Sequence, residues 1–171
     1  SGEFLTVQAD AMGGLHLPFP PSSRIRYSVT SQVPQLVADE RTASNLVYPD
    51  SIRSHYLQVP LGSQQVADLA NRVSQQTTTP FGRTLAIQQH LLKNYRYSLE
   101  ADTATLSHPL EEFLFTRKTG YCEHYATAMV VMLRTVGIPA RLVTGFLATE
   151  WNEYGGYFTV RQRDAHAWVE V

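Results

Sequence analysis

The spacing of apolar residues changes along the chain, and the change predicts both helices and strands. In 64–76 and 80–95 the apolar positions recur at intervals of three and four, as they do on one face of an amphipathic helix. Ser63 precedes the first segment and belongs to the residue types that cap helix N-termini. In 24–33 apolar and polar residues alternate, which is typical of a half-buried strand, and 54–60 is expected to be a second extended stretch.

A third helix is expected to begin at Cys122. At about 100° per residue, a set of apolar positions falls within about 80° of Cys122 on a helical wheel. This set is Ala126, Met129, Val130, Leu133 and Val136. Few polar residues interrupt the segment, so we expect the helix to be covered on most of its circumference, with Cys122 on the buried stripe. Gly137 favours a left-handed stop, and Pro139 cannot continue the helix.

Strand-like segments follow in 140–148, 156–162 and 166–171. Short connections between consecutive strands favour antiparallel pairing. Helices followed by such strands predict an α+β fold. The connection in 149–156 carries Trp151 and Tyr154, which either line a cleft or stand exposed at a hairpin tip, and the sequence favours neither interpretation.

Composition narrows the range of partners. Of the 171 residues, 43% are hydrophobic and 17% charged, as in an ordinary globular protein. The 14 Lys and Arg nearly balance the 15 Asp and Glu, so there is no electrostatic reason to expect nucleic acid or an anionic membrane surface. The sequence has no apolar run of membrane-spanning length and no signal-peptide pattern, so we expect this chain to be soluble.

The first residues differ from the rest of the chain in composition. Glycine and proline are frequent in 1–23, which favours an arm or loop over regular structure. We therefore expect 1–60 to be an N-terminal arm and strand-rich extension, and 61–171 to be the core domain.

Cys122 is the single cysteine, so it forms no disulfide within the chain and does not indicate a redox compartment. A lone cysteine is more often a small buried hydrophobe than a nucleophile. Two features favour reactivity. Gly120 allows a sharp entry into the helix, and Cys122 falls in the first turn, where unpaired N–H groups and the helix dipole stabilise a thiolate.

A nucleophilic thiol also needs a base. His124 is excluded, because two residues along a helix turn the side chain by about 200°, and the same spacing makes Cys122 and His124 a poor metal motif. His166 opens the last strand-like segment, where its imidazole can meet the N-terminus of a helix packed on that sheet. A solvated histidine at a strand edge is the open alternative. The other histidines are interpreted as surface residues: His16, His55, His90 and His108.

Two motifs make the sequence similar to a known family. They are GYCEHYATAMVVMLRTVGIPARLVTGF, which begins at Gly120, and DAHAWVEV, which begins at Asp164. The segment 61–171 resembles the transglutaminase-like cysteine enzyme superfamily, and more narrowly the core domain of bacterial membrane-anchored transglutaminase-like proteins. The resemblance implies a papain-like α+β fold with the nucleophile helix packed on an antiparallel sheet. It also implies that Cys122 is the nucleophile and His166 the general base and acid.

The resemblance further implies a third site residue, an Asp on the strand that follows the histidine. The sequence ends at Val171, soon after His166, so we expect the acid to lie beyond Val171 and the core to be truncated there. A fragment that lacks this acid can be inactive. Asp164 and Glu170 share the strand parity of His166 but do not occupy the family's acid position. The resemblance also implies a membrane-embedded bacterial parent protein whose domain faces the periplasm.

The expected chemistry is acyl transfer through a thioester. His166 takes the thiol proton, the thiolate attacks the side-chain amide of a protein or peptide Gln, and the imidazolium protonates the leaving amine. The backbone N–H of Cys122 is the expected oxyanion donor. No second donor is identified, because some family members use an upstream Trp, whereas Trp151 and Trp168 both follow the cysteine. An amine acceptor gives transglutamination, and water gives a cysteine peptidase or amidase.

A non-catalytic binding or scaffold domain is the alternative of another class, and it predicts an inert thiol. No cofactor is expected. In particular, the sequence contains no calcium loop of the D-x-D-x-D-G type. The expected partner is a protein or peptide substrate.

Overall fold

The computed structural model describes residues 6–9, 14–20, 30, 47–100 and 108–171. The chain divides into two compact units, Ser1–Gln35 and Leu36–Val171. In the first unit, the short strands β1 (Gln8–Ala9) and β2 (Leu15–His16) pair antiparallel and are exposed. The strand expected in 24–33 lies outside the described residues except for Thr30. The expected core boundary at residue 61 stays a prediction.

The second unit contains the helices predicted from apolar spacing. α3 (Gln64–Ser74) and α4 (Pro80–Asn94) form in the expected segments, and α6 (Cys122–Thr135) begins at the expected cysteine. Gly137 has the left-handed φ of +80° that ends α6. These three helix predictions are confirmed. No helix in the described part of the chain is long and apolar enough to cross a membrane.

The extended stretch expected in 54–60 is wrong in its first half, because α2 (Asp50–Tyr56) runs through it. Asp50 in the first turn and Arg53 in the last turn both have the charge that the helix dipole favours at their ends. At the end of the helix, the carbonyl of Tyr56 accepts a hydrogen bond of 3.1 Å from the N–H of Ala140. The weak alternation over seven residues could not distinguish a helix end from a strand.

Ser63 occupies the predicted N-cap position of α3. Its side chain makes no cap hydrogen bond, because the hydroxyl donates to the carbonyl of Pro60 at 2.8 Å. In contrast, Thr79 caps α4: its Oγ1 accepts the N–H of Gly82 at 3.0 Å, and Pro80 occupies the first turn.

A parallel strand pair lies beside the start of α6. The short helix α5 (Pro109–Glu111) continues into a π-helical turn, η1 (Glu112–Arg117), and the backbone reverses at Lys118 with φ of 52°. β4 (Thr119–Gly120) then pairs with β3 (Arg96–Tyr97), which follows α4. Tyr97 is thereby opposite Gly120, two residues before Cys122.

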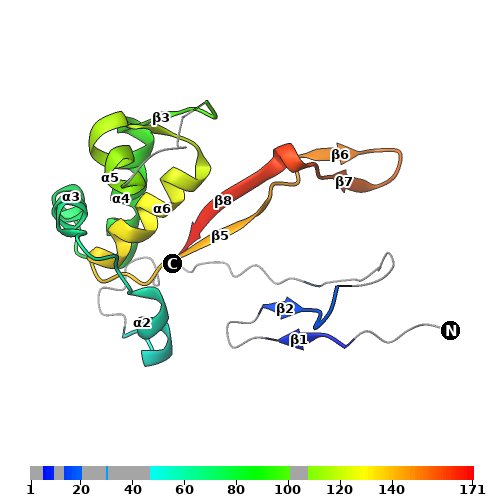
Figure 1. Cartoon of the computed structure of the whole chain (residues 1–171), viewed down its shortest axis with the longest axis horizontal. Coiled ribbons are helices and arrows are strands. Elements are labelled where there is room, and N and C mark those ends of the chain that lie inside the picture. The colour runs from blue at the N-terminus through cyan, green and yellow to red at the C-terminus, as the bar shows by residue number, and fades with distance from the viewer. Residues whose placement is uncertain (1–5, 10–13, 21–29, 31–46, 101–107) are drawn as a thin grey trace. The chain divides into compact units, whose positions relative to one another are not determined.

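α6 is the central helix of this unit. It contacts α3, α4 and α5 and also both β5 and β8, and Figure 1 shows it between the other helices and these strands. The predicted stripe is confirmed, since Ala126, Val130 and Leu133 are buried and Met129 and Val136 pack against the core. α3 and α4 contribute Val66, Ala70, Ile87 and Leu91 to the same core.

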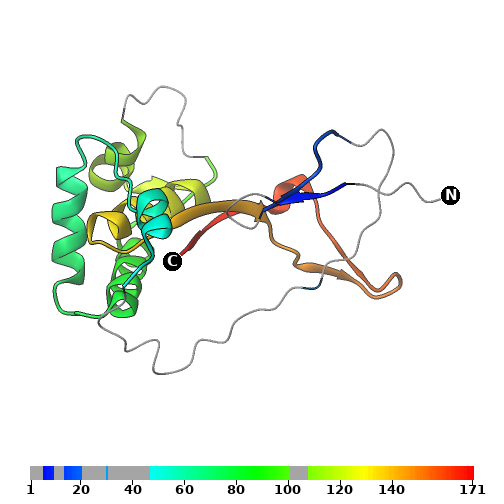
Figure 2. The same cartoon turned by 90° about the horizontal axis from the view of Figure 1, so that it is seen from below.

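The strands that follow α6 form two antiparallel pairs. β5 (Arg141–Phe146) pairs with β8 (Ala165–Glu170), and β6 (Glu150–Asn152) pairs with β7 (Tyr157–Thr159). Figure 2 shows the β5–β8 ribbon continuing into the β6–β7 hairpin. A short 3-10 turn, η2 (Gln162–Asp164), leads into β8. The predicted antiparallel pairing and the α+β class are confirmed, with a helix packed on an antiparallel pair.

Candidate active site

One cavity brings Cys122 and His166 together. It has a volume of ≈ 480 Å³ and is lined by residues of α4, β3, α6 and β8. α6 contributes Cys122 from its first residue, and β8 contributes His166 from its second. Both side chains are half-buried. The predicted convergence of the two residues is therefore found, while their chemical roles stay predictions.

The cysteine occupies the helix position that the sequence indicated. Cys122 is a free cysteine at the first residue of α6, where the backbone N–H groups have no partner within the helix. Tyr125, Ala126 and Met129, which lie three, four and seven residues further on, line the same cavity. The thiol is thus at the N-terminal end of the helix face that borders the cavity.

His124 packs against the turn that leads into this helix and does not line the cavity. Its Nδ1 accepts a hydrogen bond of 3.3 Å from the N–H of Tyr121, and the two rings meet edge to face with centroids 4.4 Å apart. The imidazole covers Gly120, where an added Cβ would be 2.7 Å from His124 Cγ. In the GYCEH motif, glycine and histidine therefore pack together and fix the turn that presents Cys122.

The surroundings of His124 favour its neutral form. Burial lowers the pKa of the imidazole, and the nearby charge of Glu123 opposes this effect in part. Because Nδ1 accepts the Tyr121 N–H, protonation at that nitrogen would break the hydrogen bond. His124 is thus a structural residue, and its exclusion as the base agrees with its place outside the cavity lining.

The position of His166 depends on the register of β5 and β8. His166 is opposite Gly145, and Ala167, next to it, is buried. Trp168 lies on the same strand and lines the cavity. Its ring fills the space above Gly145, where a Cβ would come within 2.9 Å of the indole. Because Gly145 has no side chain, the Trp168 ring can pack over it. Gly145 is also the β5 residue that pairs with His166.

Tyr97 is a cavity residue that the sequence analysis missed. It lines the cavity together with Cys122, and its backbone is paired with Gly120. Burial, and then the charge of Cys122, raise the pKa of Tyr97. No sequence pattern could identify Tyr97 as a site residue, because β3 has only two residues and a two-residue strand has no periodicity.

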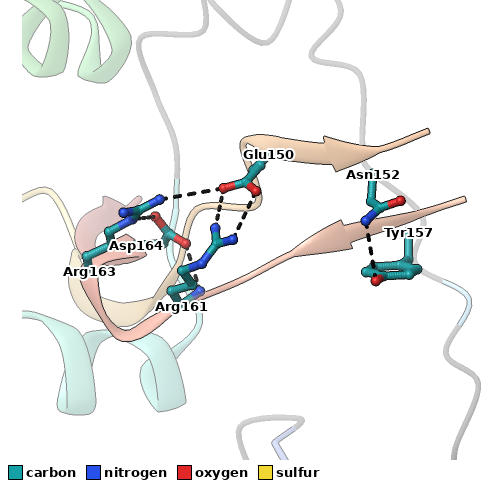
Figure 3. Close-up of polar contacts among 6 residues, drawn as sticks. All are labelled: Glu150, Asn152, Tyr157, Arg161, Arg163 and Asp164. Atoms are coloured by element: carbon teal, nitrogen blue, oxygen red, sulfur yellow. Dashed lines mark hydrogen bonds and ion pairs between the residues drawn. The ribbon is translucent and has the colours of Figure 1, made fainter. Parts of the chain in front are cut away.

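The two acids nearest to His166 in sequence are engaged elsewhere. Figure 3 shows Asp164 turned toward Arg161 and Arg163: its Oδ2 accepts the backbone N–H of Arg161 at 2.7 Å, and its Oδ1 lies 3.9 Å from Nε of Arg163. Glu170 pairs with Arg141 opposite it, with 2.7 Å between Nε and Oε2. Neither acid lines the cavity.

The β6–β7 hairpin does not form part of the cavity wall. Trp151 packs edge to face on Phe158 with ring centroids 4.9 Å apart, and Tyr154 at the tip is fully exposed. Arg161 and Glu150 form an ion pair at the base of the hairpin, also visible in Figure 3. Of the two interpretations of this segment, the exposed hairpin tip is confirmed, since neither Trp151 nor Tyr154 lines the cavity.

The other histidines of the second unit make local contacts and do not line the cavity. His55 contacts the carbonyl of Ser51 at 2.7 Å, and His90 contacts the side-chain amide of Asn94 at 3.1 Å. His108 does not line the cavity either, and His16 belongs to the first unit. Among the residues that the structure describes, no three His, Cys, Asp or Glu side chains are grouped so that they could hold a metal ion.

Comparisons with known proteins agree with this geometry. Over 116 residues, the chain is 40% identical to a protein-glutamine gamma-glutamyltransferase of Pseudomonas aeruginosa. This match covers 67% of the chain and 17% of that protein. It is also 31% identical over 161 residues to the uncharacterized protein YebA of Bacillus subtilis, which covers 85% of the chain and 21% of YebA. The chain thus spans about a fifth of the length of these relatives.

A solved structure matches the fold. The crystal structure of the periplasmic domain of TgpA from Pseudomonas aeruginosa superposes with a TM-score of 0.64 and 36% identity. The match covers 72% of this chain and 43% of that one. The periplasmic origin of that domain agrees with the location that the sequence resemblance implied.

The family model of the transglutaminase-like superfamily matches residues 67–171, which include α6, the β5–β8 pair and both candidate residues. This span is more than half of the chain and carries the cavity described above. The chain therefore belongs to the transglutaminase-like superfamily.

Proposed function

We propose that this chain carries out thiol-dependent acyl transfer on the side-chain amide of a protein or peptide Gln, with Cys122 as nucleophile and His166 as general base and acid. The observation that carries the proposal is the shared cavity. It is lined both by a cysteine at a helix N-terminus and by a histidine from a strand that contacts this helix. These are the groups that cysteine nucleophiles require.

Each step of the proposed reaction can be assigned to these two residues. His166 takes the proton of the Cys122 thiol, and the sulfur forms a bond to the amide carbon while the carbonyl π pair moves to oxygen. The C–N bond then breaks, and His166 returns the proton to the departing ammonia, which leaves a thioester. An acceptor amine attacks the thioester, loses a proton to His166 and expels the thiolate, which recovers that proton.

The Gln donor and amine acceptor are proposed from the relative named as a protein-glutamine gamma-glutamyltransferase. The lining of the cavity that holds the thiol includes the apolar side chains of Leu91, Leu92 and Met129. Apolar lining limits the access of water to a thioester, which favours an amine over hydrolysis.

The third site residue is proposed to lie beyond Val171. Asp164 and Glu170 are engaged with arginines, so neither is available to orient the His166 imidazole in the described residues. We also place the domain outside the cytoplasm of a bacterial cell, on a membrane-anchored parent protein, from its likeness to the periplasmic domain of TgpA.

Incubation of the full-length parent protein with a Gln-containing peptide and a labelled primary amine tests the proposal. We expect a mass shift on the Gln side chain that corresponds to amine incorporation, and no shift with Cys122→Ala. Cleavage of the peptide, or conversion of its Gln to Glu with release of ammonia and no incorporated amine, would favour the hydrolase instead. No product of either kind, together with a thiol that reacts no faster than free cysteine, would favour the non-catalytic domain.

A further inference from the structure

We propose that Asp164 is a positioning residue for His166: its carboxylate closes the turn that leads into β8 and so fixes the strand end from which the imidazole enters the cavity. The inference rests on the proposed function, in which His166 is the base. It deepens that function, because it assigns a role to an acid that does not line the cavity and acts through the backbone.

Asp164 closes this turn by two hydrogen bonds to one residue. It is the last residue of η2 and immediately precedes β8. Its Oδ2 accepts the backbone N–H of Arg161 at 2.7 Å, and its own N–H donates to the carbonyl of Arg161 at 2.9 Å. The side chain of Asp164 is only 17% exposed, whereas the residues on either side of it, Arg163 and Ala165, are exposed. The carboxylate is therefore set into the turn.

The main chain of Asp164 extends the β5–β8 ladder. The last residue pair of this ladder joins Phe146 to Ala165. Beyond it, the N–H of Leu147 donates to the carbonyl of Asp164 at 2.9 Å. His166 belongs to the next pair inward, so a single pair separates it from the end of the ladder. Because strands open first at their ends, the closed turn limits the motion of the backbone that carries the imidazole.

Ion pairs connect the same turn to the base of the β6–β7 hairpin. Both terminal nitrogens of Arg161 contact the carboxylate of Glu150, with 3.0 Å between Nη2 and Oε1 (Figure 3). Nη2 of Arg163 lies 3.6 Å from Oε2 of Glu150. Glu150, Arg161 and Arg163 are all much more exposed than Asp164, so water screens these pairs and each contributes little. We therefore assign the closure of the turn to the hydrogen bonds of Asp164 rather than to its charge.

The alternative role for Asp164 is direct contact with the imidazole, as the acid that orients His166. The structure favours the role through the backbone. Figure 3 shows the carboxylate directed at Arg161 and Arg163, and both of its oxygens have contacts there. Asp164 belongs to η2 and does not line the cavity, whereas His166 belongs to β8 and does.

Three substitutions of Asp164 in the full-length parent protein separate these roles. Asp164→Ala removes the acceptor, Asp164→Asn keeps an acceptor oxygen at the same reach without the charge, and Asp164→Glu keeps the charge but moves it by one methylene. Glu170→Ala is the matched control, because it removes an ion-paired acid from the other end of β8. We measure kcat and KM for amine incorporation and the rate of Cys122 alkylation at pH 7, at a temperature where denaturation curves show the variants folded.

We expect Asp164→Ala to lower kcat by about 10–100-fold with KM little changed, because a displaced imidazole takes up the thiol proton poorly. The alkylation rate should fall toward that of free cysteine, which a loss of stability alone would not cause. Asp164→Asn should restore both quantities, because its amide oxygen can accept the N–H of Arg161, and Asp164→Glu should not. Glu170→Ala should leave both within about twofold of wild type.

Wild-type turnover and alkylation in Asp164→Ala would overturn the proposal, and so would a loss of turnover without a loss of alkylation. Activity that Asp164→Glu keeps and Asp164→Asn loses would assign the effect to the charge, as direct contact with the imidazole requires. This order also decides between the two roles if Asp164→Ala does not fold.

The proposed function can fail separately from this proposal. A wild-type protein that transfers no acyl group but alkylates faster than free cysteine would overturn the proposed function, while the alkylation series would still support or contradict the role of Asp164. A wild-type alkylation rate equal to that of free cysteine would overturn both.

Discussion

The imidazole of His124 lies over Gly120 so closely that a Cβ at Gly120 would be 2.7 Å from its Cγ and 3.0 Å from its Nδ1. The same Nδ1 accepts the N–H of Tyr121, so the contact links the residue before the turn to the first turn of α6. The histidine nearest to the cysteine in sequence thus acts on the backbone that positions the thiol.

Gly120→Ala is expected to displace the His124 ring and to lower stability by about 1–3 kcal/mol, as overpacking of a buried site does. His124→Ala removes the ring, so the double variant should be more stable than the sum of the two single effects predicts. Chemical denaturation of wild type, both single variants and the double variant measures the coupling. Strict additivity would show that the alanine is accommodated without moving the imidazole.

His124 also predicts a pH dependence of stability. Burial lowers its folded-state pKa, so the unfolded chain takes up the proton first as pH falls. The contribution of His124 is fully present above about pH 6.5, the ordinary histidine value, and is lost as pH falls through the lower folded pKa.

The free energy of unfolding, measured between pH 7.5 and 5 on wild type and His124→Ala, checks this prediction. Burial also lowers the pKa of His90, which titrates in the same range in both proteins. The difference between the two curves therefore isolates His124. It should shrink as pH falls, and a difference that is constant with pH would contradict the assigned role.

The sequence predicted the site residues that lie on elements with a periodic apolar pattern. Apolar residues spaced three and four apart predicted α6 with Cys122 at its start, and alternating apolar residues predicted the strand that carries His166. It could not predict Tyr97, because β3 is two residues long and is defined only by its pairing with β4. The end of α2 at Tyr56 was missed because the alternation in 54–60 is too short to distinguish a helix end from a strand.

Gly145→Ala is expected to disturb the strand position that faces His166. The added Cβ would be 2.9 Å from the Trp168 ring, so the indole or the β5–β8 register must shift. Because small misplacements of a reacting group are costly, we expect kcat/KM for amine incorporation to fall roughly 10–100-fold. The neighbouring variant Thr144→Ala, at an exposed position of β5, is the control and should retain wild-type kinetics. Wild-type kinetics in Gly145→Ala would mean that Trp168 moves without affecting His166.

Arg134 connects the end of α6 to two other segments. Its Nε donates to the carbonyl of Ala140 at 2.8 Å, and its Nη1 donates to the carbonyl of Gln58 at 2.9 Å. Arg134→Ala leaves both carbonyls without this donor and should lower the free energy of unfolding by about 1–3 kcal/mol. Arg72→Ala, at an exposed position of α3, should change it by less than about 0.5 kcal/mol. Equal effects of the two variants in denaturant titration would contradict the structural role of Arg134.

The rate of Cys122 alkylation by iodoacetamide near pH 7 tests the central claim most directly, because it reports whether His166 activates the thiol before any substrate is chosen. In the full-length parent protein, with the modified peptide identified by mass spectrometry, we expect wild-type Cys122 to react faster than free cysteine. His166→Ala should lower the rate toward that of free cysteine, and His90→Ala, outside the cavity, should leave it unchanged. A wild-type rate equal to that of free cysteine and unaffected by His166→Ala would contradict the account.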